Sequence, residues 1–248
     1  MESVASLLKN AQYALRNQKF EDAKKCFLLI LKIDPSSVIS HYSVGLIFLN
    51  QKKFHKALEY FEKAADLCQD DPNILYQYAN MLYKSAKYHK AVEQYEKALK
   101  LDPNHIPSLN DYSVCMYLLG KLEKSEKAAR KVININQSYV HPYVNLANIL
   151  KDKGLINQAL VYYEKALSIN PSFYLARSNK LLCLCYSDLE KEIIFEEHKK
   201  WEKNIPLVIP RRDFKRNNFT KGKKPLHIGY ISADFKTHSV AYYIEPII

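Results

Sequence analysis

The sequence predicts an all-α fold, a right-handed superhelical solenoid of stacked helix pairs, and three observations lead to this prediction. A pattern recurs about every thirty-four residues, in windows that start at Val4, Val38, Pro72, Ile106 and Val140. Two positions in each window hold a small residue: Ala11, Gly45, Ala79, Ser113 and Ala147 at the first, and Ala23, Ala57, Ala91, Ser125 and Ala159 at the second. Four places after the second stand Phe27, Phe61, Tyr95 and Tyr163, with Ala129 as the exception.

Each element of the window has a physical reason. Two antiparallel helices approach closely only where side chains are small, and an aromatic residue of the second helix fills the groove against the next unit. Gly120 and Gly154 stand where a first helix must end. The units close on Asp34-Pro35, Asp71-Pro72, Asp102-Pro103 and Asn170-Pro171, because proline cannot continue a helix.

This pattern resembles the tetratricopeptide repeat. The resemblance implies five to six repeats over residues 1–189, and the apolar spacing after Pro171 adds capping helices, the last a junction helix at 190–205.

Composition places the chain among soluble proteins of the cytoplasm, with the nucleus as the alternative compartment. No apolar run approaches the roughly eighteen residues that span a bilayer, and the N-terminus lacks the features of a signal peptide. The five cysteines show no C-x-x-C spacing, so the sequence predicts buried free thiols and no disulfide framework or metal site.

The net charge of +11 is concentrated in one stretch. Ten basic and two acidic residues lie between Lys199 and Lys224, which therefore carries +8. A segment of this kind is more often a solvated linker than an RNA site, so we assign 206–224 to a basic interdomain linker and do not expect a nucleic acid partner.

The concave groove of such a solenoid is lined by the first helix of each pair, and this defines the candidate binding residues. Amide and hydroxyl groups dominate there and suit hydrogen bonds to an extended peptide. The alternative is a solvated inner face. The candidates are Tyr42, Tyr76, Asn80, Asn110, Asn145 and Asn148.

A second resemblance appears after the repeats. Ser178-Asn179, Leu182, Tyr186, Phe195, His198 and Trp201 are similar to the junction in glycosyltransferases of the O-GlcNAc transferase and SPINDLY type. Residues 225–246, PLHIGYISADFKTHSVAYYIEP, resemble the opening of the catalytic region in that family. The resemblance implies that 225–248 begins a catalytic domain and that His238 is an active-site histidine. It also implies a nucleotide-sugar donor for a full-length form, UDP-N-acetylglucosamine or GDP-fucose. The family's asparagine row along the groove survives, in the five windows, only at Asn145.

From the residues alone, Leu226–Ser232 is a buried strand followed by a turn and a helix from about Val240, the first βα unit of an α/β domain. His238 lies in that turn, where ligands usually bind, and the alternative is a turn histidine that caps the helix. One such unit cannot bury its apolar sides. We therefore expect no activity and no bound cofactor from this chain alone, whether it is truncated or a natural short protein.

Two hypotheses for the function follow. The first is the repeat arm and catalytic-domain start of a protein O-glycosyltransferase, with UDP-N-acetylglucosamine as the preferred donor and Ser or Thr of proteins as acceptors. The second is a non-catalytic repeat scaffold that binds protein or peptide segments. Both predict protein partners in the groove, and the repeats also allow a homo-oligomer.

Overall fold

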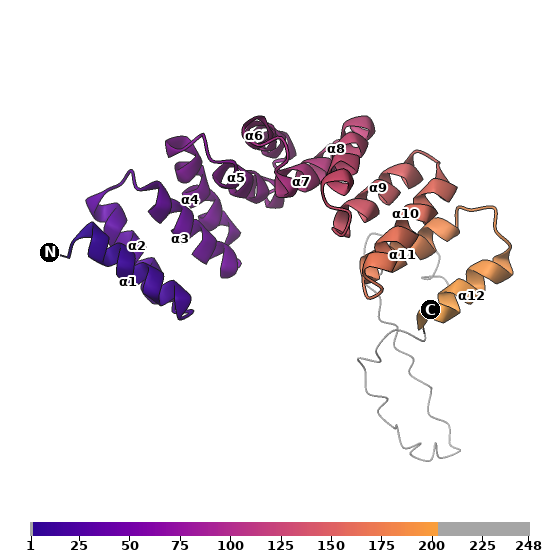
Figure 1. Ribbon diagram of the computed structural model, residues 1–248, viewed down its shortest axis with the longest axis horizontal. Helices are drawn as coiled ribbons and strands as arrows, with labels where there is room; N and C mark the ends of the chain where they lie inside the picture. The colour runs from indigo at the N-terminus through magenta and orange to yellow at the C-terminus, as the bar shows by residue number, and fades with distance from the viewer. Residues whose placement is uncertain (1, 203–248) are drawn as a thin grey trace, which may run out of the picture. The chain divides into compact units, whose positions relative to one another are not determined.

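The computed structural model describes residues 2–202, and the fold in that range is entirely helical. The helices come in consecutive pairs along the chain (Figure 1). Their bounds are α1 Val4–Arg16, α2 Phe20–Ile33, α3 Val38–Asn50, α4 Phe54–Leu67, α5 Pro72–Lys84, α6 Tyr88–Leu101, α7 Ile106–Leu118, α8 Leu122–Ile135, α9 His141–Asp152, α10 Ile156–Ile169, α11 Tyr174–Leu184 and α12 Lys191–Glu202. The predicted fold class, a solenoid of helix pairs, is confirmed.

Four of the five predicted windows begin at the first residue of an odd-numbered helix, which we call helix A of its unit. In the fifth, the backbone of Val140 is already helical, but α9 begins one residue later, at His141. The even-numbered partner is helix B. The thirty-four-residue register also continues into α11, which begins at Tyr174, as the helix A of a sixth unit.

The turn between helix A and helix B uses one left-handed residue in each of the first five units. The predicted glycines are two of them, since Gly120 has φ +70° and Gly154 has φ +77°. The other three units have Gln18, Lys52 and Ala86 there, with φ between +56° and +58°. The left-handed residue reverses the chain, so that the next N–H bonds back into the last turn of helix A, as in Lys121 N to Met116 O at 2.8 Å.

The turn between units explains the Asp-Pro and Asn-Pro pairs, with one correction. The Asp or Asn side chain accepts the N–H two residues later, at 3.0 Å in Asp34–Ser36 and 2.9 Å in Asp102–Asn104. Asp71-Pro72 does something else. The second unit ends helix B at Leu67, with Cys68 as the cap, whereas Asp71 caps the start of α5 by accepting from Asn73 N at 2.8 Å.

The core consists of the contacts that the small positions permit. Gly45 shows how tight they are, because a Cβ there would meet a ring carbon of Phe61 at 2.9 Å. Ala129, the exception among the bulky positions, is fully buried in a cluster that includes Tyr143 of α9. In the fourth unit, serines occupy both small positions, and their buried hydroxyls are both hydrogen-bonded. Ser125 Oγ donates to Ser113 O at 2.7 Å, and Ser113 Oγ donates to Ser125 O at 2.9 Å.

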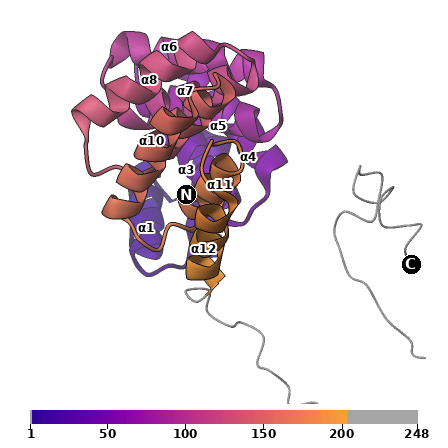
Figure 2. The ribbon, with the colours of Figure 1, turned by 90° about the vertical axis from the view of Figure 1, so that its right-hand side faces the viewer.

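The two helix types occupy different faces of the stack. Helices A approach one another directly in the pairs α5–α7, α7–α9 and α9–α11, whereas no two helices B within residues 2–202 make comparable contact. Figure 2 shows α6, α8 and α10 at the periphery, with α5 and α7 further in. Helices A therefore line the inner, concave face and helices B the outer face.

The last two helices differ from the regular pairs. α11 packs on α9 and α10 like any helix A, whereas α12 meets α11 over far fewer residues than the other helix pairs share. α12 lies within the range 190–205 predicted for a junction helix. The predicted basic linker at 206–224, the βα unit at 225–248 and His238 lie outside the described residues.

The cysteine prediction was wrong in part. The five thiols are free, but only Cys115 and Cys183 are buried, and Cys185 is exposed near the end of α11. Among the described residues, no helix has the length and apolar character to cross a membrane.

Candidate functional site

The candidate site is the concave face formed by helices A, and its centre is a hydrogen-bond network that spans three units. Tyr76 Oη of α5 donates to Asp111 Oδ2 of α7 at 3.0 Å. Asn110 Nδ2 donates to Asp111 Oδ1 at 2.8 Å, and Asn145 Nδ2 of α9 donates to Asn110 Oδ1 at 3.2 Å. Three of the six predicted residues therefore meet, and Asp111 joins them.

Asp111 is the one acidic group of this network. Burial raises the pKa of its carboxyl, while the hydrogen bonds from Asn110 and Tyr76 and the nearby His141 act in the opposite direction. Burial is also the main cause of the raised pKa of Tyr76, which stays protonated and donates to the carboxylate. The network thus holds a largely desolvated carboxyl group at the centre of the groove.

A second network lies one turn further along α9. Asn148 Oδ1 accepts two hydrogen bonds, from Tyr163 Oη at 2.5 Å and from Asn179 Nδ2 of α11 at 3.0 Å. No described residue accepts from Asn148 Nδ2, so its N–H groups remain available. The amide of Asn148 is therefore held in a fixed orientation with its donors unused.

Of the two remaining predicted residues, Tyr42 lies outside these networks, whereas Asn80 joins the first network through Tyr76. Tyr42 packs its ring edge-on against Phe61, with 5.7 Å between ring centroids, and burial raises its pKa. Asn80 is half-buried on α5 and acts on Tyr76, whose pKa a hydrogen bond with the Asn80 side chain lowers. Both residues support the groove near the second and third units.

Aromatic rings border the groove at the N-terminal ends of the later helices A. His105 meets Tyr76 edge-on at 5.6 Å, and its Nε2 lies 3.3 Å from Asn73 Oδ1. Further along, the His141 ring lies 5.3 Å from Tyr139 and 5.2 Å from Phe173. Rings of this kind present flat apolar surface beside the polar floor.

The arrangement can bind but offers little for catalysis. Asn110 is only 8% exposed and uses both its donor and acceptor groups within the network. Asn145 keeps its carbonyl oxygen, and Asn148 keeps its N–H groups. One acceptor and one donor of this kind match the N–H and C=O of an extended peptide. Within residues 2–202, no three His, Cys, Asp or Glu side chains form a metal-binding group.

Sequence reasoning missed two members of the site. Asn179 occupies the position of Asn145 in the sixth helix A, so the asparagine row does not stop at Asn145; extending the thirty-four-residue period to Tyr174 finds it. Asp111 was visible at that same position, but its role depends on a tyrosine thirty-five residues earlier, and no local motif signals such a pair.

Comparison with known proteins places the chain among tetratricopeptide-repeat proteins. Models described as tetratricopeptide repeat match residues 8–72 and 142–173. A model described as anaphase-promoting complex, cyclosome, subunit 3 matches residues 50–132. The chain is built of tetratricopeptide repeats.

Curated relatives are proteins named probable UDP-N-acetylglucosamine–peptide N-acetylglucosaminyltransferase SPINDLY. The rice protein is 38% identical over 84 residues, and the Arabidopsis thaliana protein is 36% identical over 78 residues. The matches cover 34% and 31% of this chain, but only 9% and 8% of those proteins. The chain thus aligns with a small part of much longer relatives.

Solved structures share the fold. A tetratricopeptide repeat protein from Parabacteroides merdae superimposes with a TM-score of 0.70 at 15% identity, over 81% of this chain and 79% of that one. YrrB, described as a protein with an unusual peptide-binding site, gives 0.66 at 20% identity, over 72% and 92%. Pseudomonas aeruginosa PilF gives 0.66 at 17%, over 82% and 92%.

Proposed function

We propose that the chain binds extended protein segments along its concave face, with Asn145 and Asn148 as the groups that hold the segment's backbone. The observation that carries the proposal is the state of these two amides. Asn145 is held by a hydrogen bond to Asn110 of the preceding unit, and Asn148 by hydrogen bonds from Tyr163 and from Asn179 of the next unit. Each amide keeps one hydrogen-bonding group without a partner among residues 2–202.

Preorganisation is the physical reason to expect binding there. An amide already held by protein groups loses little side-chain freedom when a ligand arrives, so more of the interaction free energy appears as affinity. The border of His141, Tyr139 and Phe173 offers apolar contact to side chains of the bound segment. Backbone hydrogen bonds do not depend on side-chain identity, so we expect broad sequence tolerance.

Selection from a displayed library of random peptides tests the proposal. We expect the full chain to enrich peptides that lose at least tenfold in affinity for the N145A/N148A variant. The matched control is N157A/Q158A, which removes two exposed amides from the outer helix α10 and should leave the affinity unchanged. Selected peptides that bind both variants equally well would place binding elsewhere and refute the proposal.

A second function is favoured by a specific observation, the similarity to SPINDLY proteins together with the I-G-Y-I-S-A-D-F run at 228–235. In this hypothesis the repeats are the arm that recruits protein substrates for a protein O-glycosyltransferase. The hypothesis predicts an open reading frame beyond the codon for Ile248. Its product should transfer sugar from UDP-N-acetylglucosamine or GDP-fucose to Ser or Thr, and H238A should abolish the transfer. A stop codon directly after Ile248 would refute it.

A further inference from the structure

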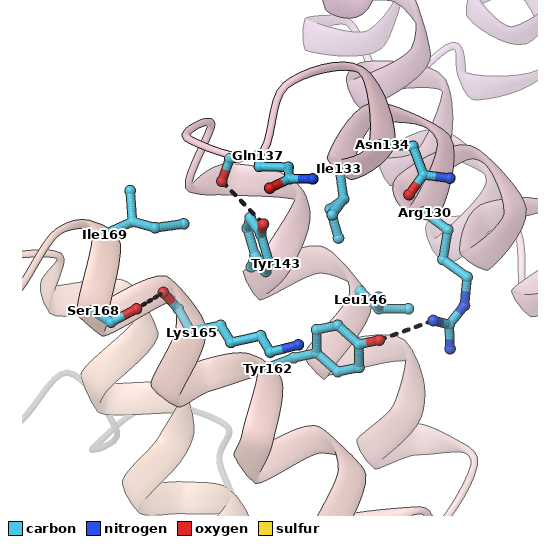
Figure 3. Close-up of a pocket in the computed structure, with 10 residues that line it drawn as sticks. All are labelled: Arg130, Ile133, Asn134, Gln137, Tyr143, Leu146, Tyr162, Lys165, Ser168 and Ile169. Carbon is cyan, nitrogen blue, oxygen red and sulfur yellow. Dashed lines mark hydrogen bonds between the residues drawn. The ribbon is translucent and has the colours of Figure 1, made fainter.

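A recess on the outer face, between the helices B of the fourth and fifth units, has no part in the proposed groove. It encloses about 630 Å³ between α8 and α10, with the turn after α8 as its upper wall (Figure 3). We call it the α8–α10 recess. Its lining combines apolar side chains, among them Ile133, Leu146 and Ile169, with the cations Arg130 and Lys165.

The recess has a counterpart three units earlier that differs in charge. A recess of about 640 Å³ between α2 and α4 contains Tyr60 and Lys63, which occupy the repeat positions of Tyr162 and Lys165. The position of Arg130, however, is Leu28 there, and the counterpart has Lys32 and Asp66 where the α8–α10 recess has Asn134 and Ser168. The two recesses therefore occupy the same place in the repeat but differ in their lining residues. The α2–α4 recess is a natural control for the α8–α10 recess.

Between the second and third units, and between the third and fourth, a hydrogen bond between two side chains crosses the place that corresponds to the recess. Tyr78 donates to Glu62 at 2.7 Å, and Tyr112 donates to Glu96 at 3.2 Å. Leu146 stands at the position of those tyrosines, and it cannot make such a bond. The glutamates are replaced by Arg130, so the fourth unit reverses the charge found at this position in its neighbours.

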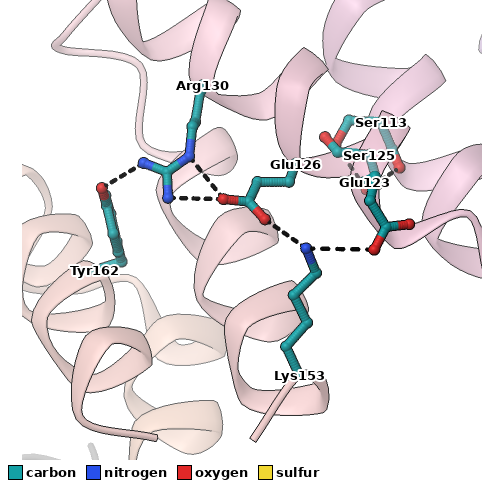
Figure 4. A network of polar contacts seen from close by, with 7 residues as sticks. All are labelled: Ser113, Glu123, Ser125, Glu126, Arg130, Lys153 and Tyr162. Atoms are coloured by element: carbon teal, nitrogen blue, oxygen red, sulfur yellow. Dashed lines mark hydrogen bonds and ion pairs between the residues drawn. The ribbon is translucent and has the colours of Figure 1, made fainter. Parts of the chain in front are cut away.

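The charges around the recess leave a positive excess. Glu126 accepts from Arg130 Nε and from Lys153 Nζ, each at 2.8 Å, so one carboxylate serves two cations (Figure 4). Lys153 also lies 3.7 Å from Glu123. Lys165 pairs with no carboxylate among residues 2–202, and its ammonium lies 5.1 Å from the centroid of the Tyr162 ring.

Tyr162 contacts both cations, Arg130 and Lys165, and so holds them at the same side of the recess. Arg130 Nη1 donates to Tyr162 Oη at 2.9 Å, and the guanidinium lies 5.6 Å from the ring centroid. In Figure 3 the Lys165 ammonium points toward the same ring from the opposite side. The Arg130 side chain stays 43% exposed, so guanidinium N–H groups not used by Glu126 and Tyr162 remain open to an incoming acceptor.

We propose that the α8–α10 recess binds an acidic or phosphorylated side chain of a partner protein segment, held by Arg130 and Lys165. The neighbouring apolar side chain of that segment packs on Ile133 and Ile169, which are partly exposed, above the fully buried Leu146. A planar guanidinium and an ammonium are the usual pair for carboxylate or phosphate oxygens. The volume is that of a site for several ligand groups rather than for a bare ion. Nucleic acid would require a run of cations along the surface, whereas Glu123 and Glu126 adjoin this recess.

Methyl-detected NMR of the full chain tests this inference, because isoleucine and leucine methyls line the recess. The probes are acetyl-Leu-Glu-Leu-amide, its glutamine and phosphoserine counterparts, inorganic phosphate and an octathymidine oligonucleotide. We expect the glutamate and phosphoserine peptides to shift the resonances of Ile133, Leu146 and Ile169, and the glutamine peptide to bind at least tenfold more weakly. The stronger of the two anionic peptides identifies the natural anion.

Matched variants locate the binding. R130L introduces the residue found at this position in the first unit, and it should weaken the anionic peptides at least fivefold, as should K165A. K63A alters the counterpart recess and should change nothing. Circular dichroism confirms that each variant is folded. Equal binding of the glutamine peptide, an equal effect of K63A, tighter binding of octathymidine, or phosphate alone binding as tightly as the peptides would each overturn the proposal.

Discussion

Tyr95 and Tyr163 occupy the same position of two repeats, and the structure predicts opposite effects for the same substitution. Both side chains are fully buried. Tyr163 Oη donates to Asn148 Oδ1 at 2.5 Å, whereas Tyr95 Oη has no hydrogen-bond partner within residues 2–202. The equivalent residues Phe27 and Phe61 show that the position accepts a ring without a hydroxyl.

The magnitudes follow from the two environments. A buried hydroxyl without a partner costs about 1–3 kcal/mol, so Y95F should stabilise the chain by about 1 kcal/mol once the lost van der Waals contacts of the hydroxyl oxygen are subtracted. Y163F loses one neutral hydrogen bond, worth about 1 kcal/mol. The loss stays near that value because Asn148 Oδ1 keeps its bond from Asn179 and is not left without a donor. The two variants should therefore differ by about 2 kcal/mol.

Urea unfolding of the full chain, followed by circular dichroism at 222 nm, measures the difference. The dependence of the unfolding free energy on urea must be equal for both variants, because a repeat array can lose cooperativity and then report a local transition. If Y95F destabilises the chain as much as Y163F does, the Tyr95 hydroxyl has a partner in solution and the reasoning fails.

Three further predictions concern the turns, the outer network and the groove. At the left-handed turn position, A86G should stabilise the chain by up to about 1 kcal/mol and G120A should destabilise it by about 1 kcal/mol. A Cβ at Gly120 meets nothing within 4 Å, so G120A adds only backbone strain. Changes of melting temperature with the same sign for both variants would refute this. The hydrogen bond from Lys153 is the largest of the effects that lower the pKa of Glu126. The ionised Glu126 therefore stabilises the fold above its unfolded-state pKa, and this stabilisation is lost as the pH falls through its folded-state pKa. E126Q should reduce the pH dependence of the unfolding free energy, measured in urea, between pH 6 and 3. Burial raises the pKa of Asp111, so the wild type loses stability as the pH rises through that pKa. The unfolding free energy of D111N, relative to that of the wild type, should therefore be higher at pH 7 than at pH 4. If this difference is the same at both pH values, the carboxyl is not desolvated.

The fold could be predicted because its determinants are local and repeated. Small residues such as Ala79 and Ala91 mark the helix contact wherever they occur at the right spacing, and five copies reinforce one another. The turns were less readable. Gly120 and Gly154 announce a left-handed residue, but Gln18, Lys52 and Ala86 adopt the same conformation without any compositional signal, because the surrounding helices impose it.

The site could be predicted only in outline. The period places Asn110 and Asn145 on one face, but it does not show that Asn110 forms hydrogen bonds with Asp111 and Asn145. Such pairing depends on how far one unit is rotated and shifted against the next. The α8–α10 recess was not predicted. It arises in part because position 146 is a leucine, whereas the third and fourth units have a tyrosine at this position.

The outer face shows why a repeat array can acquire a binding site without loss of its fold. The contacts that hold the units together use the small and aromatic positions, and these stay fully buried in the fourth and fifth units. In the fourth unit, Ser113 and Ser125 replace alanine and bond to each other, and Ala129 replaces the aromatic residue. Leu28 and Arg130, which occupy the same position in the two outer recesses, lie outside that set. Exchanging them alters the charge of a ready-made cavity while the core stays the same, so recognition on this face is free to differ from one unit to the next.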